Sequence, residues 1–144
     1  MQKRNSDKLQ YAIRSLEDAL KYSQSSEFQG LGMEFKTILA SAVAQNFHLT
    51  FSVCRQMIER QLADRLGEKA MGMMAADELL RMAVKEGMIT HLDHWLEYLD
   101  CEQATSASNG VLRAFEKAPA FLEDASELLR TCITRSQNER RRAA

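Results

Sequence analysis

The chain has 144 residues, of which 45% are apolar and 27% are charged, with 19 basic side chains against 20 acidic ones. A chain of this length is expected to form one domain, and it can bury about two-thirds of its unfolded surface in a single core. Because the charges nearly cancel, the composition excludes a protein that attracts nucleic acid through its overall field, and we do not expect nucleic acid as a partner.

The cysteines and the hydropathy pattern indicate where the protein works. Cys54, Cys101 and Cys132 are widely spaced, so they form neither a disulfide framework nor a zinc motif. Free thiols are typical of a reducing compartment, and we expect the cytoplasm. No window has the roughly 18 consecutive apolar residues that span a bilayer, and no apolar segment follows the charged N-terminus. We therefore expect a soluble protein that has no membrane contact and needs no cofactor.

Few glycines, one proline and few β-branched runs favour an all-α chain. An apolar stripe predicts a first helix over about 6–25, and it consists of Leu9, Ile13, Leu16 and Leu20. Gly30 and Gly32 mark a turn, and a longer apolar pattern then predicts a helix over about 34–66. Residues 67–77 are interpreted as a loop.

The second half of the chain predicts shorter helices. Asp77 is placed as the cap of a helix that Gly87 ends, and a further helix follows over about 92–100. Pro119 suits the first turn of a last helix. Residues 136–144 form a basic tail that we expect to fray. Such amphipathic helices predict an antiparallel up-and-down four-helix bundle with a short additional helix, in a single domain over 1–144.

Two segments carry a resemblance to a known family. In the first, over 42–58, the residues that match the family pattern are Gln45, Phe47, Thr50 and Phe51, with Val53 in place of a leucine. His48 and Ser52 stand where that pattern has glutamates. In the second, over 77–100, the matching residues are Ala83, Gly87, Ile89, Trp95 and Leu99. With the last helix included, about 35–133 resembles the nucleotidyltransferase substrate-binding proteins, which are helical bundles related to the HEPN superfamily.

The chain departs from the family in the stretch after the Trp95 helix. The family typically has Arg-Asn-x-x-Ser-His there, often followed by a tyrosine. In this chain Glu102 falls at the arginine, Gln103 at the asparagine, Ser106 in the polar middle, Ala107 at the histidine and Asn109 at the tyrosine. An alanine cannot transfer a proton, and a glutamate repels the phosphate that an arginine would hold. No other Arg or His occurs between His94 and Arg113, so a shifted register restores nothing.

The resemblance therefore implies a non-catalytic binding subunit. Family members pair with a separate small nucleotidyltransferase, and many form homodimers. By family position, the residues expected to contact a partner or a nucleotide are Gln45, His48, Ser52, Glu102, Gln103, Ser106 and Asn109. The pair could be toxin-antitoxin-like. No residue is assigned a catalytic role, and no metal is assigned.

Three alternatives stay open. A HEPN-type ribonuclease could use a displaced histidine, His48 or His94, with Arg55 or Arg113, provided that the two converge in a cleft. The bundle could instead be a purely homo-oligomeric interaction module. A metal could bind His91 and His94, but an exposed or capping role is the more ordinary one for residues of this type.

Overall fold

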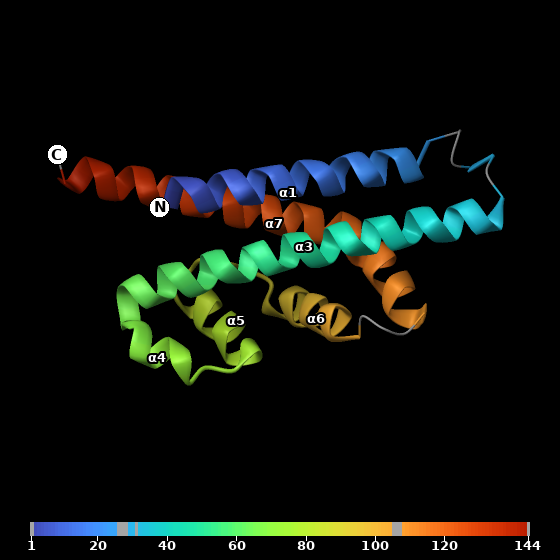
Figure 1. Ribbon diagram of the computed structural model, residues 1–144. Helices are drawn as coiled ribbons and strands as arrows, with labels where there is room; N and C mark the ends of the chain where they lie inside the picture. Colours follow the sequence, from blue (N-terminus) through green and yellow to red (C-terminus); the bar gives the residue numbers. More distant parts are fainter. Residues whose placement is uncertain (1, 26–28, 31, 105–107, 144) are drawn as a thin grey trace.

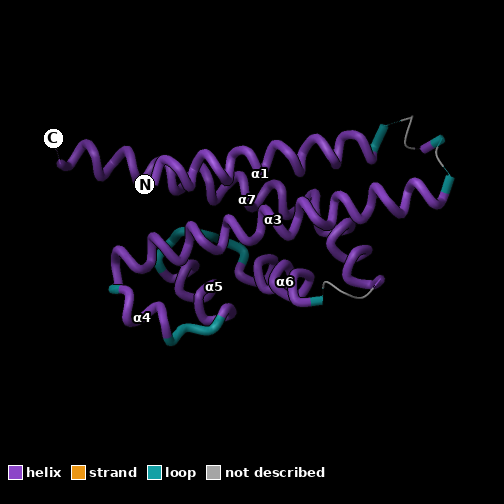
Figure 2. Tube along the Cα trace, in the orientation of Figure 1, coloured by secondary structure: helices purple, strands orange, loops and turns teal. Residues whose placement is uncertain are grey.

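The computed structural model of the protein describes residues 2–25, 29–30, 32–104 and 108–143. Within these ranges the chain folds into helices joined by turns, and no strand occurs (Figure 2). The helices in chain order are α1 (Gln2–Ser23), α3 (Met33–Leu66), α4 (Glu68–Gly72), α5 (Ala76–Lys85), α6 (Leu92–Gln103) and α7 (Ser108–Ala143). The prediction of an all-α fold is confirmed.

The helices form a bundle in which neighbours in the chain alternate in direction. The long helices α1, α3 and α7 pack on one another, while α5 and α6 follow one after the other in the fourth position (Figure 1). α1 and α6 run opposite to α3, and α7 runs in the same direction as α3 (Figure 1). The predicted up-and-down four-helix bundle is therefore confirmed, with α4 as the short additional helix.

Aromatic side chains from three helices form the centre of the core. They are Phe47 and Phe51 of α3, Trp95 and Tyr98 of α6, and Phe121 of α7, each at most 1% exposed. The Phe121 ring lies 4.6 Å from the ring of Phe47 and 5.0 Å from that of Tyr98, measured between centroids. Burial of one such side chain stabilises a fold by about 1.5–3 kcal/mol. This cluster holds α6 between α3 and α7, and thereby positions the polar residues at the end of α6.

Two short-range predictions in the middle of the chain were wrong. The segment after Gly67 contains the five-residue helix α4, where we predicted only a loop. Met71 in this helix and Met74 after it pack partly against the core, while Met73 is exposed, so the segment covers one end of the bundle. Ala75 is the N-cap residue of α5, and Asp77 lies inside its first turn, where its charge still favours the helix dipole.

The last helix was also predicted incorrectly, because α7 begins eleven residues before Pro119 and continues through it. A proline removes one N–H and can kink a helix without ending it. Pro119 is exposed, whereas Ala118 and Phe121 beside it are fully buried, so packing holds both halves of α7 in place. α7 bends within its orange portion (Figure 1). It extends to Ala143 with exposed residues after Ser136, and the fraying of this tail stays a prediction.

Candidate functional site

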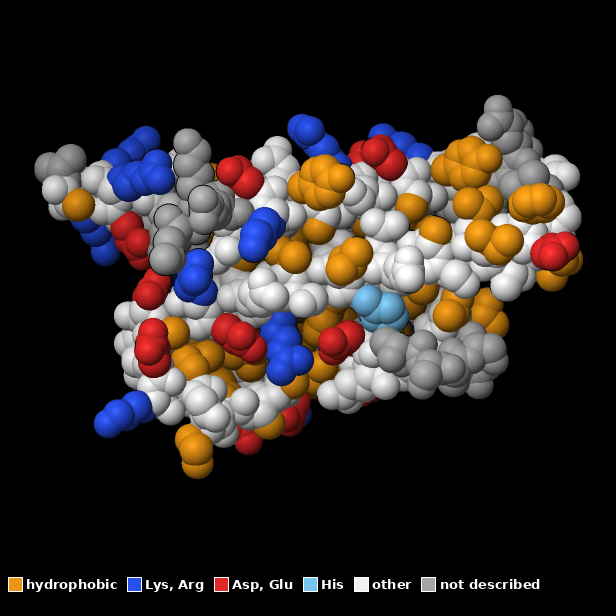
Figure 3. All heavy atoms as spheres, in the orientation of Figure 1, with side chains coloured by type: hydrophobic (Ala, Val, Ile, Leu, Met, Phe, Trp, Pro, Cys, Tyr) orange, Lys and Arg blue, Asp and Glu red, His pale blue; other side chains and the backbone are white. Residues whose placement is uncertain are grey.

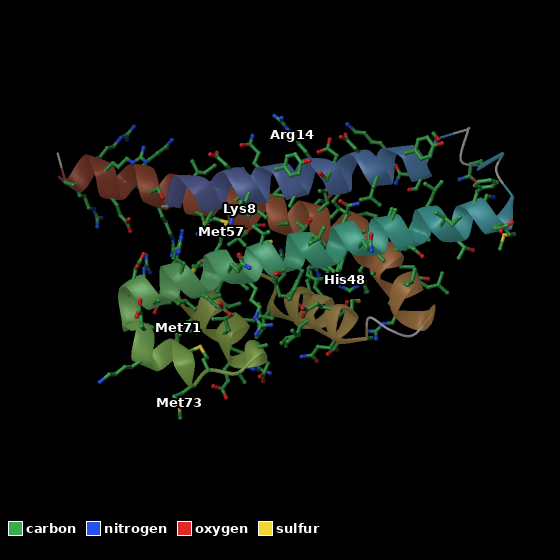
Figure 4. All side chains as sticks on the ribbon, in the orientation of Figure 1. Lys8, Arg14, His48, Met57, Met71 and Met73 are labelled. Atoms are coloured by element: carbon green, nitrogen blue, oxygen red, sulfur yellow. The ribbon has the colours of Figure 1, made fainter. Side chains whose placement is uncertain are left out.

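Three of the predicted contact residues lie on one face of α3. Gln45, His48 and Ser52 follow one another at spacings of three and four residues, which places them one above the other on the helix surface. Gln45 and Ser52 are exposed, and His48 is half-buried. The His48 side chain lies on the side of α3 that is turned toward α6 (Figure 4).

The end of α6 brings a fourth predicted residue to this face. α6 extends to Gln103, three residues beyond its predicted end, so that Glu102 and Gln103 lie in its last turn. Glu102 is half-buried, and its carboxylate raises the pKa of His48. Burial acts in the opposite direction and is the larger effect, so the His48 pKa is lowered overall. The His48 imidazole is therefore mainly neutral at neutral pH.

The His48 ring has an unused hydrogen-bonding atom. Its Nδ1 is buried and has no hydrogen-bond partner among the described residues. The ring packs edge-on against Phe47, with 5.7 Å between the centroids, and this core contact holds the imidazole in place. An unsatisfied buried nitrogen costs about 1–3 kcal/mol, and such groups in folded proteins call for an explanation.

The structure says less about the three remaining residues that were predicted to contact a partner. Gln103 is exposed at the end of α6. Ser106 lies outside the described residues. Asn109 lies in the first turn of α7, and its side chain is not described. The structure thus brings together His48 of α3 and Glu102 of α6, and it places Gln45 and Ser52 beside them on α3.

A second polar cluster lies between α6 and α7, and of its members only His91 and His94 were expected from the sequence. Tyr98 donates a hydrogen bond of 2.5 Å to Oδ2 of Asp124, and His94 Nδ1 lies 3.2 Å from the same oxygen. The ring of His91 stacks on that of His94, with centroids 4.8 Å apart. Burial, followed by the hydrogen bond to Asp124, raises the pKa of Tyr98 well above its usual range. This network joins the two helices and borders an open hollow of about 550 Å³.

Asp124 was missed, although the sequence contains a signal for it. It falls three residues after Phe121 and four before Leu128, on the stripe that faces the core. An acid on an apolar stripe is rarely buried without a partner. His94 and Tyr98 are four apart on one helix and face it, but the thirty residues between His94 and Asp124 hide this contact from local reasoning.

Glu97 and Cys101 lie at helical spacing from His94 and could join it at a metal, and Arg55 is one of the ribonuclease candidates, but each of them has another partner or is buried. Glu97 accepts a hydrogen bond from Lys117, and Arg55 pairs with Glu59 at 3.3 Å. Cys101 is buried, and burial raises the pKa of its thiol. In the part of the chain that the structure describes, no group of three or more His, Cys, Asp or Glu side chains is placed to hold a metal ion.

The fold is an all-α bundle in which His48 of α3 and Glu102 of α6 lie on adjacent helices. A family model described as "nucleotidyltransferase substrate binding protein like" matches residues 4–133. The chain belongs to this family. The match begins at α1, about thirty residues before the start of the resemblance found in the sequence.

A solved structure has the same fold. It is described as HI0074 from Haemophilus influenzae, which "reveals the fold of a substrate binding domain of a nucleotidyltransferase". It is 22% identical to this chain, and the alignment covers 88% of this chain and 98% of that one with a TM-score of 0.81. A comparison with curated protein sequences found no match. Among the described helices, none is both long enough and apolar enough to cross a bilayer.

Proposed function

We propose that this chain is a non-catalytic subunit that docks a separate small nucleotidyltransferase, a nucleotide, or both. The contact face consists of Gln45, His48 and Ser52 on α3 with Glu102 and Gln103 on α6. The partner enzyme supplies the transfer chemistry, and the bundle supplies the docking surface. We further propose that the protein is one domain and works in the cytoplasm as a homodimer, as half of a toxin-antitoxin-like pair.

The observation that carries this proposal is the position of the half-buried His48 ring at the junction of α3 and α6, beside the carboxylate of Glu102. His48 is held by Phe47 on one side and lies within the electrostatic reach of Glu102 on the other. A neutral imidazole beside a carboxylate offers one hydrogen-bond donor or acceptor and one negative charge, while Gln45 and Ser52 add exposed polar groups. This set suits a polar protein surface.

The charge of this face decides between the two kinds of partner. A nucleotide phosphate requires cations or a row of backbone N–H groups, and the described contact face carries Glu102 without an arginine or lysine among the five residues. A protein surface that presents a basic residue to Glu102 fits this face better. We therefore propose a nucleotidyltransferase as the main binding partner of this face and a nucleotide as the second choice.

The ribonuclease alternative has less support. It requires a histidine and an arginine in one cleft, but His94 is bonded to Asp124 and Arg55 is paired with Glu59. Arg113 lies on the exposed surface of α7, where its charge acts on Cys101. These contacts engage His94 and Arg55, so the ribonuclease alternative is left with His48 and Arg113.

Affinity purification of the tagged chain from its own cells tests the proposal. Captured proteins are identified by mass spectrometry, and bound nucleotides by chromatography. We expect a small nucleotidyltransferase in a stoichiometric amount. Recovery of the chain alone, without a nucleotidyltransferase and without a nucleotide, would favour the interaction module instead.

A further inference from the structure

Positive charge is concentrated at one end of the bundle. The net charge of −1 gives no field that attracts nucleic acid, but the fold distributes the charges unevenly. α1 and α7 pack side by side, and the two ends of the chain lie close together (Figure 1). Residues 2–14 and 130–143 contain nine of the 19 basic residues and two of the 20 acidic ones. The rest of the chain therefore has ten basic and eighteen acidic residues.

The last two turns of α7 project beyond the other helices. Ser136 still lines a crevice together with Ser6 of α1 and Arg60 of α3, whereas residues 137–143 are all exposed. These seven residues extend over about 10 Å at 1.5 Å per residue. Figure 1 shows this part of α7 continuing past the start of α1. The projecting segment is therefore accessible to a partner from several sides.

Three consecutive arginines cover this segment. Arg140, Arg141 and Arg142 follow one another at about 100° around the helix axis, so they point in three different directions. None of them forms an ion pair with a described side chain. Basic residues in the last turn also interact favourably with the helix dipole. The dipole does not account for basic residues that lie next to this segment on other helices.

The basic surface continues from α7 onto α1 and α3. Arg60 lines the crevice at Ser136, and Lys8 lies two residues after Ser6, which lines the same crevice. Lys8 and Arg60 are both exposed, and neither forms an ion pair within the described part of the chain. Lys and Arg side chains gather over the end of α7 and along α1 (Figure 3). A polyanion would meet cations from three helices here.

The shape and composition of the projecting segment favour one kind of polyanion. A guanidinium group binds a phosphate through two parallel hydrogen bonds. Residues 137–143 include no large apolar side chain that could insert into an anionic membrane, and residues 130–143 include no aromatic side chain on which the bases of a single strand could stack. A helix about 10–12 Å in diameter fits the major groove of B-form DNA, which is about 12 Å wide, whereas that of duplex RNA is narrow.

We propose that the projecting end of α7 binds duplex DNA in the major groove, with Arg140, Arg141 and Arg142 contacting phosphates on both sides of it. Lys8 and Arg60 contact the adjoining phosphates. Because these contacts are made to the backbone, the binding is independent of sequence. It uses none of the residues of the His48–Glu102 face and does not depend on a nucleotidyltransferase partner.

Fluorescence anisotropy with a labelled DNA duplex of about 20 base pairs tests the proposal. At about 50 mM salt the wild-type chain should bind with a dissociation constant on the order of 1–10 µM. The logarithm of the binding constant should fall against the logarithm of the salt concentration with a slope of about −4.5, because each of five phosphate contacts contributes about −0.9.

The combined substitutions Arg140→Gln, Arg141→Gln and Arg142→Gln should reduce the magnitude of this slope by about 2.7 and weaken binding at about 100 mM salt by at least 30-fold. Lys8→Gln together with Arg60→Gln should reduce the slope by about 1.8. All five side chains are exposed, so circular dichroism should show an intact fold.

The matched control combines Lys69→Gln, Arg81→Gln and Lys85→Gln, which remove the same charge from exposed positions on α4 and α5. It should leave the DNA affinity within about threefold of wild type. An equal loss in this control would overturn the proposal, since only the overall charge would then matter. No binding at about 50 mM salt would also overturn it, as would tighter binding to an RNA duplex or to anionic vesicles. DNA binding by a chain that captures no nucleotidyltransferase would support this inference and count only against the proposed partner.

Discussion

Tyr98 of α6 donates a hydrogen bond of 2.5 Å to Asp124 of α7, and both residues are buried. The bond ties the two helices together directly beside the aromatic core. The hydrogen bond matters for stability because its acceptor is a buried carboxylate. If the carboxylate loses this donor, its desolvation is no longer compensated and the fold is destabilised. Among the described residues, Asp124 keeps the longer contact to His94 if Tyr98 is changed.

We therefore expect Tyr98→Phe to lower the free energy of unfolding by about 1–3 kcal/mol. The ring remains, so the loss reports the hydrogen bond and not the packing. Tyr11→Phe is the control, since Tyr11 is 75% exposed and its hydroxyl should contribute less than about 0.5 kcal/mol. Urea unfolding of the two variants measures both values. Equal stability of Tyr98→Phe and wild type would contradict this account of the α6–α7 contact.

His48 should make the stability depend on pH. Its pKa in the folded protein is below its ordinary value of 6.5, mainly because of burial. At pH values between the folded-state pKa and 6.5, the unfolded chain binds more protons than the folded chain. The free energy of unfolding therefore rises with pH across this window. The contribution of His48 is present in full above about pH 6.5 and is lost as the pH falls toward the folded-state pKa.

Replacement of the His48 imidazole should remove its contribution to the pH dependence of stability. We expect His48→Gln to lose less stability than wild type when the pH is lowered from about 7.5 to about 5, and the difference between the two proteins isolates His48 from the other titrating groups. An NMR titration of the ring protons gives the folded-state pKa directly. A His48 that titrates above 6.5 would show that Glu102 outweighs burial.

The end of α5 depends on a glycine and on an arginine from α7. Gly87 has a φ of +73°, and a Cβ at this position would lie 3.3 Å from Nη2 of Arg135. The same Nη2 donates a hydrogen bond to the backbone oxygen of Glu86, which caps α5. Gly87→Ala should therefore destabilise the protein by about 1–2 kcal/mol, through backbone strain and crowding of Arg135.

Gly72→Ala is the matched control for Gly87→Ala. No heavy atom lies within 4 Å of a Cβ built at Gly72, and this residue is in the helical segment α4. Its replacement should leave stability unchanged or raise it by up to about 1 kcal/mol. Thermal unfolding of both variants separates a requirement for positive φ from a general sensitivity to glycine replacement. Equal effects of the two substitutions would contradict the prediction.

The three thiols should be inert in the folded protein. Cys54, Cys101 and Cys132 are all buried, and burial raises the pKa of each, for Cys132 to about 11. Since the thiolate is the reactive form, a disulfide reagent at about pH 8 should modify the native chain slowly and the urea-unfolded chain completely. Rapid modification of one thiol in the native state would contradict this prediction and show that its helix opens locally.

Helical periodicity was sufficient to predict α1 and α3, because their core stripes repeat over many turns. α7 was not predicted as one helix, since Pro119 is a local signal for a helix start, whereas Ala118 and Phe121 on either side of it are packed against other helices and keep α7 continuous. The end of α6 was placed early for a similar reason, because the polar Glu102 and Gln103 have no apolar pattern.

The candidate site was predictable where a family pattern exists and not where tertiary contacts create it. His48 and Glu102 were identified by family position, and the structure brings them close together. Asp124 had no such position, and its bond to Tyr98 joins residues that are 26 apart. The outward apolar face of α3 was present in the sequence as Phe35, Ile38 and Leu49, but periodicity alone does not distinguish a face that meets the core from one that meets solvent.

The most direct test of the central claim is the affinity of the captured nucleotidyltransferase for variants of the α6 end, measured by titration calorimetry. Glu102→Lys should weaken binding by about tenfold or more, because it reverses the charge beside His48. Asp100→Lys, the same charge change on an exposed residue of the same helix, should leave the affinity within about twofold of wild type. Equal affinities for wild type and both variants would contradict docking through the His48–Glu102 face.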